Sequence, residues 1–245
     1  MDEGQKIARF LANIHRHLPK MTPSPVKESR MAYFDPLWAY NGESTMDFYH
    51  DGMRELQDRY EGRAVADRLE HHRMRTTFND DDRSLIETAS FFFLASAAGD
   101  NVDCSFKGGA PGFVRITGKQ ELTWPDYDGN RMYRSLGNIL RSPRVGLLFL
   151  SFDGNRFDGS AARLRITGKA SIANSDSGIA DWPGAKRLIR LAVDFIFPNC
   201  PRYIPKMVSV RDSIFAPREG HKPPEADWKS REFVKDIFDA ENFEA

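Results

Sequence analysis

The feature that most constrains the fold is a succession of short apolar runs between Ser90 and Ile172, each the length of a β-strand. The runs are SFFFLASA, VDCSF, GFVRITG, KQELTW, VGLLFLSF and ARLRITGKASI. Most are separated by Gly-, Asp- or Asn-containing segments, which favour tight turns. Closely spaced strands of this kind predict an antiparallel barrel or sandwich rather than a parallel sheet.

Helices are expected around these strands and once between them. Apolar spacings of three and four residues, with caps at helix starts, predict helices over residues 1–20, 44–73, 80–89, 130–143, 182–197 and 231–243. Either Ser44 or Thr45 is the expected cap of the second helix. Residues 21–43 contain three prolines and are expected to form an extended arm.

Composition excludes several functional classes. Lys plus Arg and Asp plus Glu both number 35, so the formal net charge is zero and favours neither nucleic acid nor an acidic membrane surface. The sequence has no apolar run long enough to span a membrane and no signal-like start, so we expect a cytoplasmic protein. With two cysteines and no histidines at ligand spacing, we expect no metal site.

Two segments carry residue types that bind anions. Asn130, Arg131 and Arg134 follow a turn at the predicted start of a helix, where backbone N–H groups and guanidinium groups together suit a phosphate. The alternative is a solvated helix start with two surface arginines. Ser105 and Lys107, next to two glycines at a strand end, are a second candidate, with a bulged hairpin end as the alternative.

The order of four segments resembles the pyridoxamine 5′-phosphate oxidase superfamily. SPRVGLLF (142–149) followed by ARLRITGKA (162–170) is similar to paired strands of that family. Residues 130–139 are similar to its helix start that holds the flavin phosphate, and residues 91–97 look like its first barrel strand. The resemblance covers about residues 65–205.

The resemblance implies a mainly β fold with flanking helices, an antiparallel split β-barrel of the FMN-binding type. It divides the chain into an N-terminal helical extension and arm (1–79), an FMN-binding split-barrel domain (80–215) and a C-terminal tail with a short helix (216–245). It further implies a homodimer with FMN bound between the subunits. Leu56–Leu69 and Pro198–Met207 look like a subgroup of FMN-dependent enzymes within this superfamily.

The resemblance also implies cofactor contacts for eight residues. To the phosphate it assigns Ser105, Lys107, Asn130, Arg131 and Arg134. To the flavin ring and ribityl chain it assigns Trp124, Pro125 and Arg163. No catalytic residue follows from it, since a bound flavin would itself accept the hydride.

Two departures from the family pattern bear on activity. Met132 stands where the family has a lysine, and the C-terminal Arg-x-His pattern that holds substrate phosphate in true pyridoxamine phosphate oxidases is not found. We therefore expect an FMN-dependent oxidoreductase that transfers hydride between an unidentified small substrate and flavin N5, rather than a vitamin B6 oxidase. Open alternatives are a non-catalytic flavin or tetrapyrrole binder, a deazaflavin-dependent barrel and a structural dimer without cofactor.

Overall fold

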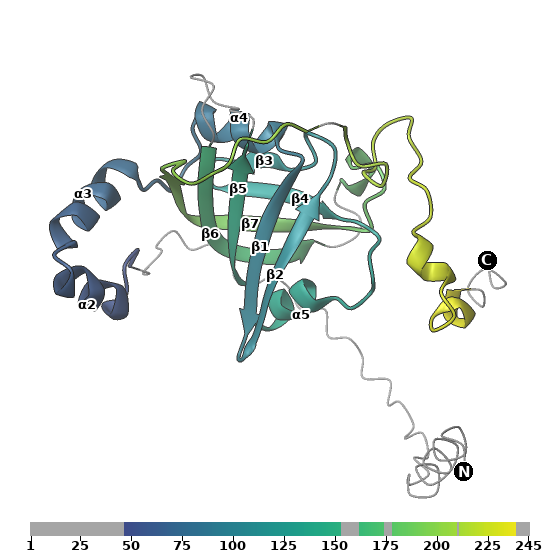
Figure 1. The fold of residues 1–245 in the computed structure, drawn as a ribbon, viewed down its shortest axis with the longest axis horizontal. Coiled ribbons are helices and arrows are strands. Elements are labelled where there is room, and N and C mark those ends of the chain that lie inside the picture. Colours follow the sequence, from purple (N-terminus) through teal and green to yellow (C-terminus); the bar gives the residue numbers. More distant parts are fainter. Residues whose placement is uncertain (1–46, 153–161, 174–177, 210, 239–245) are drawn as a thin grey trace, which may run out of the picture. The chain divides into compact units, whose positions relative to one another are not determined.

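The computed structural model of the chain describes residues 47–152, 162–173, 178–209 and 211–238 (Figure 1). The helix predicted over residues 1–20, the arm over 21–43 and the cap at Ser44 or Thr45 lie outside these residues. No helix in the described ranges is long and apolar enough to cross a membrane.

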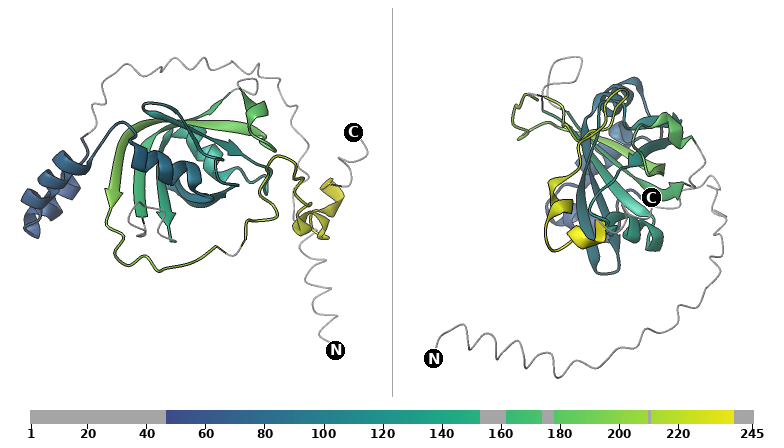
Figure 2. Two further views of the ribbon diagram at one scale, coloured as in Figure 1. Left: turned by 90° about the horizontal axis from the view of Figure 1, so that it is seen from above. Right: turned by 90° about the vertical axis from the view of Figure 1, so that its right-hand side faces the viewer.

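One antiparallel sheet of seven strands dominates the fold, in the order β2-β1-β5-β6-β7-β4-β3. Its strands are β1 (Phe91–Ala98), β2 (Asn101–Gly108), β3 (Arg115–Gly118), β4 (Glu121–Asp126), β5 (Arg144–Ser151), β6 (Ala162–Ala173) and β7 (Arg187–Asn199). Every strand expected from the apolar runs is present. The sheet curls around a common interior but is not closed, since β2 and β3 are its two edges (Figure 2). The expected mainly β split-barrel class is confirmed.

Aromatic side chains fill the interior of the sheet. Along β1, alternate residues from Phe92 to Ser96 are buried, as expected for a strand with one face on the core. The Phe92 ring stacks on Phe149 of β5, with 5.1 Å between centroids, and meets Trp124 of β4 edge-on at 5.5 Å. All three side chains are fully buried, so they tie three strands that are far apart in sequence into one core.

The helix between β4 and β5, α5 (Arg134–Arg141), packs against the β1–β2 hairpin. Its apolar face buries Leu136 and Ile139. The buried Asn138 side chain donates hydrogen bonds to Ser96 Oγ at 3.3 Å and to the Asn101 carbonyl at 3.1 Å. The helix therefore holds a fixed position beside the inner side of β2.

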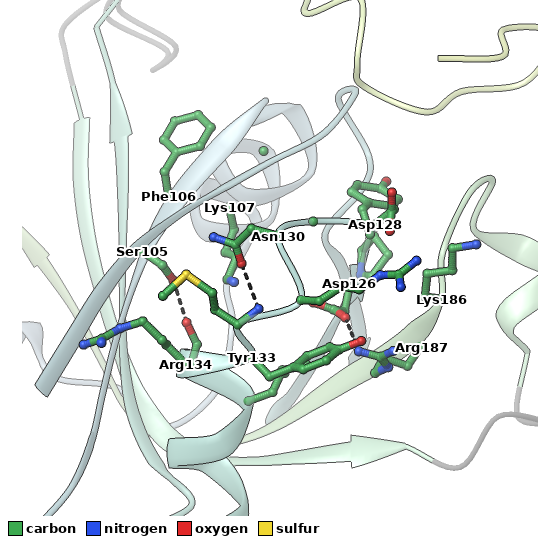
Figure 3. Close-up of a pocket in the computed structure, with 18 of the residues that line it drawn as sticks. Ser105, Phe106, Lys107, Asp126, Asp128, Asn130, Tyr133, Arg134, Lys186 and Arg187 are labelled. Atoms are coloured by element: carbon green, nitrogen blue, oxygen red, sulfur yellow. Dashed lines mark hydrogen bonds and ion pairs between the residues drawn. The ribbon is translucent and has the colours of Figure 1, made fainter. Parts of the chain in front are cut away.

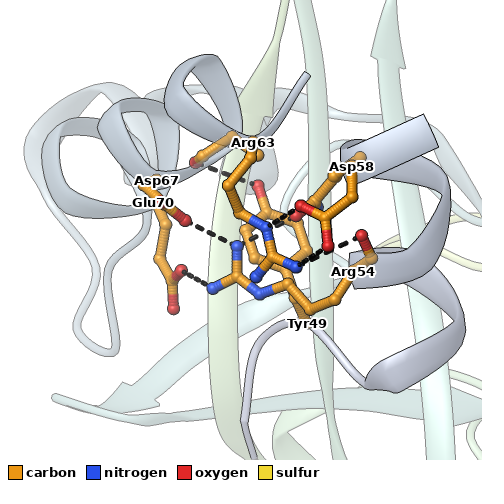
Figure 4. Close-up of polar contacts among 8 residues, drawn as sticks. Tyr49, Arg54, Asp58, Arg63, Asp67 and Glu70 are labelled. Carbon is orange, nitrogen blue, oxygen red and sulfur yellow. Dashed lines mark hydrogen bonds and ion pairs between the residues drawn. The ribbon is translucent and has the colours of Figure 1, made fainter. Parts of the chain in front are cut away.

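The helix expected up to Arg73 is instead two helices, α2 (Asp51–Arg59) and α3 (Arg63–Arg73). His50 caps α2, and the chain turns at Glu61, which has a left-handed backbone, and at Gly62. The Arg54 guanidinium on α2 pairs with Asp67 and Glu70 on α3, which fixes the two helices against each other (Figure 4). The single-helix prediction was wrong because the apolar residues keep their helical spacing on both sides of the turn at Glu61 and Gly62, so the spacing alone does not reveal the turn.

The helix predicted over residues 182–197 is wrong, since Arg187–Asn199 form strand β7, between β6 and β4. A bulge explains the mistaken spacing. Thr167 pairs with Phe195 and Gly168 with Val193, which leaves Asp194 as an extra residue. The bulge shifts the alternation, so buried positions before and after it fall three residues apart, as they do on a helix.

The remaining helices are short. The predicted helix at Asp80 is confirmed as α4 (Asp80–Thr88), with a capping box formed by Asn79 and Asp82. Two 3₁₀ turns, η1 (Ile179–Asp181) and η2 (Asp227–Ser230), follow later in the chain. Residues 235–238 form a helical turn in the region of the predicted terminal helix.

Candidate functional site

Three polar side chains of β2 form a row on the inner side of the sheet. Asp103, Ser105 and Lys107 alternate with outward-facing residues, and their cross-strand partners on β1 are the buried Ser96, Leu94 and Phe92. A row of polar groups on the core side of an edge strand requires partners or a ligand, because burial without hydrogen bonds is costly. This row forms one wall of a pocket (Figure 3).

The second wall is the loop that leads into α5. The helix begins at Arg134, so Asn130 and Arg131 precede it rather than occupying its first turn as expected. Arg131 and Tyr133 both have positive φ, 56° and 50°, a conformation that is strained for residues with side chains. The Asn130 side chain accepts a hydrogen bond from the Met132 N–H at 3.0 Å, which stabilises this turn. Tyr133, the N-cap residue, makes no side-chain capping bond, so no such bond covers the N–H groups at the helix start.

The third wall comes from β4 and β7, which pair so that Asp126 lies opposite Arg187. The Arg187 guanidinium donates to Asp126 Oδ2 at 2.8 Å and lies 5.1 Å from the centre of the Tyr133 ring. Lys186 is adjacent, and its backbone N–H donates to the Asp126 carbonyl at 2.8 Å. The pocket therefore joins segments that are distant in sequence.

The C-terminal segment contacts the rim of the same loop. Lys229 pairs with Asp128 at 2.6 Å, and Lys229 is largely buried while Asp128 is exposed. The Arg131 guanidinium lies 4.7 Å from the centre of the Phe238 ring, a cation–π distance. Asp128 and Arg131 of the loop are thus both contacted by residues of the C-terminal segment.

The pocket has a volume of about 410 Å³, within the range of small-molecule sites. Its charged residues are Lys107, Arg131, Arg134, Lys186, Arg187, Asp103, Asp126 and Asp128. Cations outnumber carboxylates by two, although the whole chain is neutral. A phosphomonoester carries nearly two negative charges at neutral pH, so the pocket matches it in charge.

Burial and neighbouring charges shift three pKa values in the pocket. Burial lowers the pKa of Lys107, although Asp126 and Asp103 act in the opposite direction. Burial raises the pKa of Asp126 against the effects of Arg187 and Lys107. The hydrogen bond from Ser135 is the main cause that lowers the pKa of Asp103, and Arg134 adds to it. Burial thus disfavours the charged form of both Lys107 and Asp126, and shifts of this kind cluster at functional sites.

Six of the eight residues expected to contact a cofactor line this pocket. They are Ser105, Lys107, Pro125, Asn130, Arg131 and Arg134. The other two lie elsewhere in the described chain. Trp124 is a core residue that is 1% exposed, since its side chain points to the opposite face of β4 from Pro125. Arg163, on β6, donates to the Cys200 carbonyl at 3.0 Å and does not line the pocket.

Sequence reasoning missed the buried Ser135 and five charged pocket residues, Asp103, Asp126, Asp128, Lys186 and Arg187. A signal for Asp103 was present, because it lies two residues before Ser105 and four before Lys107 in a strand. Arg187 was hidden by the mistaken helix at residues 182–197. Among the described residues, no group of three or more His, Cys, Asp or Glu side chains is arranged to hold a metal ion.

Several solved structures are similar to this chain. The chain is similar to the Group A Streptococcus protein HupZ at 12% identity over 49% of this chain and 93% of that one, with a TM-score of 0.38. An FMN-binding protein from Syntrophomonas wolfei matches at 13% identity, covering 61% and 97%, with a TM-score of 0.36. A putative pyridoxamine 5′-phosphate oxidase from Listeria innocua matches at 19%, covering 47% and 92%, with a TM-score of 0.32. No curated protein matches the chain.

The family comparison is more direct. The family model described as pyridoxamine 5′-phosphate oxidase matches residues 78–200, which is half of the chain. The matched range runs from just before α4 to the end of β7 and so includes the whole sheet and α5. On this match, the chain belongs to the pyridoxamine 5′-phosphate oxidase family.

Proposed function

We propose that the pocket between β2, the loop before α5 and the β4–β7 edge binds FMN, and that the protein is an FMN-dependent oxidoreductase. The observation that carries the proposal is the concentration of positive charge beside a helix start. Five cationic side chains line a pocket of a chain whose net charge is zero. Membership of a family named for an oxidase supports the same proposal.

The residues present fit a phosphate-bearing ligand. The N–H groups at the start of α5 are not capped by the Tyr133 side chain, and the helix dipole places partial positive charge there. Lys107 is half-buried and its pKa is lowered by burial, so a bound dianion would relieve the cost of its charge. Arg131 and Lys186 line the same pocket and would add to the attraction.

A bound flavin supplies the redox chemistry through its ring. The chain would then need to bind the phosphate, orient the ring and exclude water. This division of roles agrees with a pocket rich in binding groups.

We further propose that the protein acts as a homodimer that completes the pocket. Phe91 lies on the outer face of the sheet between two stacked rings, with its ring centroid 5.3 Å from that of Phe106 and 6.0 Å from that of Phe152. Phe106 is 62% exposed and also lines the pocket. A second copy covering this aromatic face would bury it and close the adjoining side of the pocket. Light scattering on the purified protein and on Phe106→Glu tests the proposal. A dimer that becomes a monomer in the variant is expected, and a monomeric unsubstituted protein would refute it.

An absorbance spectrum of the purified protein, followed by identification of any ligand released by heat, tests the cofactor. Flavin bands and release of FMN are expected. A featureless spectrum that FMN titration leaves unchanged would overturn the proposal and leave deazaflavins, tetrapyrroles or no ligand. Anaerobic titration of the flavin-loaded protein with a panel of hydride donors then tests turnover. Failure of every donor to bleach the flavin would favour the non-catalytic alternative.

A further inference from the structure

A continuous hydrogen-bond chain runs along one side of the pocket. Ser135 Oγ, at the start of α5, donates to Asp103 Oδ2 at 2.6 Å. Ser105 Oγ lies 2.9 Å from Ser135 Oγ, and Ser105 lines the pocket (Figure 3). The Ser135 side chain is buried, so this chain is fixed between β2 and α5.

The direction of the protons in this chain follows from its carboxylate end. The hydrogen bond from Ser135 and the neighbouring Arg134 keep the pKa of Asp103 below its usual range, so Asp103 is ionised and accepts only. Each serine hydroxyl has one proton. Ser135 gives its proton to Asp103, so Ser105 must give its own proton to Ser135. The lone pairs of Ser105 Oγ are then what Ser105 offers to the pocket.

A phosphate dianion carries acceptor oxygens and suits donors, so it is a poor match for Ser105 in this state. The Arg134 guanidinium is paired with the Asp103 carboxylate at 3.2 Å, so the two charges offset each other and this end of the pocket offers a phosphate no net positive charge. This end of the pocket therefore favours a ligand group that donates a hydrogen bond.

We propose that Ser105 is an acceptor subsite that binds a hydroxyl of the ribityl chain of FMN, and that Asp103 is the positioning residue that sets its polarity. The inference rests on FMN binding as proposed above. Lys107 is two residues further along the same row, roughly 7 Å from Ser105 measured along the strand backbone, and would hold the phosphate. In FMN the ribityl hydroxyls are the hydrogen-bond donors that adjoin the phosphate, whereas the N–H of the flavin ring lies at the far end of the molecule.

Titrations with four probes test the subsite in the full chain: FMN, riboflavin, lumiflavin and inorganic phosphate. Riboflavin lacks the phosphate, and lumiflavin lacks the whole chain. Ser105→Ala is expected to lower the affinities for FMN and for riboflavin by the same factor, roughly 2- to 13-fold for the loss of one hydrogen bond. Lumiflavin and inorganic phosphate are expected to bind the variant as they bind the unsubstituted protein.

Three outcomes overturn the inference. If Ser105→Ala weakens FMN and inorganic phosphate but not riboflavin, Ser105 donates to the phosphate, and FMN binding itself still stands. If all four affinities are unchanged, Ser105 contacts no part of the ligand. If the unsubstituted protein binds neither FMN nor riboflavin, the proposed cofactor fails and the subsite fails with it.

A charge-matched pair of variants tests the role of Asp103. Asp103→Asn and Asp128→Asn each remove one carboxylate of the pocket that is paired with one cation, Arg134 or Lys229. Only the first lets an amide N–H donate to Ser135, which frees the Ser105 proton to point into the pocket. The ratio of FMN to riboflavin affinity is expected to rise more in Asp103→Asn than in Asp128→Asn. Equal ratios in the two variants would mean that Asp103 acts by charge alone and does not set the polarity of Ser105.

Discussion

Replacing Lys107 by Met separates the binding role of this residue from its effect on stability. The ammonium group is half-buried beside Asp126 and Asp103, and burial lowers its pKa in spite of both carboxylates. A lowered pKa means that the charged form is less favourable in the folded chain than in the unfolded chain. Methionine has a similar length without the charge.

Two effects of opposite sign are therefore expected from Lys107→Met. Loss of a charge-assisted hydrogen bond to the phosphate should weaken the binding of FMN by about 1.5–3 kcal/mol, which raises its Kd roughly 10- to 150-fold. The unliganded protein should be at least as stable as before, because the lowered pKa already includes the attraction of the carboxylates. The same variant should bind riboflavin almost unchanged.

Flavin fluorescence titration gives the affinities, and urea denaturation without ligand gives the free energy of unfolding. Lys119→Met is the control, since it removes an exposed lysine that does not line the pocket. It should change FMN affinity by less than about twofold, as is usual for surface charges screened by salt. Equal FMN affinity in Lys107→Met and Lys119→Met would show that the phosphate does not bind at Lys107.

Four further predictions test other parts of the structure. Arg131→Ala should weaken the binding of FMN by roughly 1.5–3 kcal/mol in the same titration. Circular dichroism should show an intact fold. An unchanged Kd would contradict the assignment of Arg131 to the phosphate. Gly168→Ala should destabilise the sheet by about 3 kcal/mol or more in urea, because its Cβ would lie 2.1 Å from the Ala192 carbonyl oxygen. Gly137→Ala, at an exposed position of α5 where the added Cβ would meet nothing within 4 Å, should instead stabilise the fold by up to about 1 kcal/mol. Because burial raises the pKa of Asp126, its ionisation disfavours folding. The stability gain of Asp126→Asn should therefore be absent below the unfolded pKa of about 3.9, grow between that pH and the raised folded pKa, and stay constant above it, and a gain that shrinks with pH would reverse this reasoning.

Much of the fold was predictable because strand signals are local. The runs that form β1, β2, β4, β5 and β6 have apolar residues and turn residues in sequence order, so burial and turn geometry identify them. The position of β7 was not predictable in this way. Its bulge at Asp194 changes the spacing of buried residues, and only pairing with β6 and β4 reveals it as a strand.

For the candidate site as well, residues in a local sequence pattern were predictable and the others were not. Ser105, Lys107, Asn130, Arg131 and Arg134, which line the pocket, were predicted from the sequence because each lies in a local pattern, a polar strand end or a helix start. Trp124 was assigned to the cofactor from the resemblance alone. In the structure it is a core residue, because neighbouring residues of a strand point to opposite faces.

The sequence by itself determined the residue types, the strand-and-turn order that leads to a split barrel, and the family to which the chain belongs. Only the tertiary structure decided which charges meet. Asp126 and Arg187 are far apart in sequence and pair through the β4–β7 register. Asp103 reaches Ser135 because α5 packs beside β2. Such contacts depend on how strands and helices pack, and no local pattern encodes the direction of a hydrogen bond between two of them.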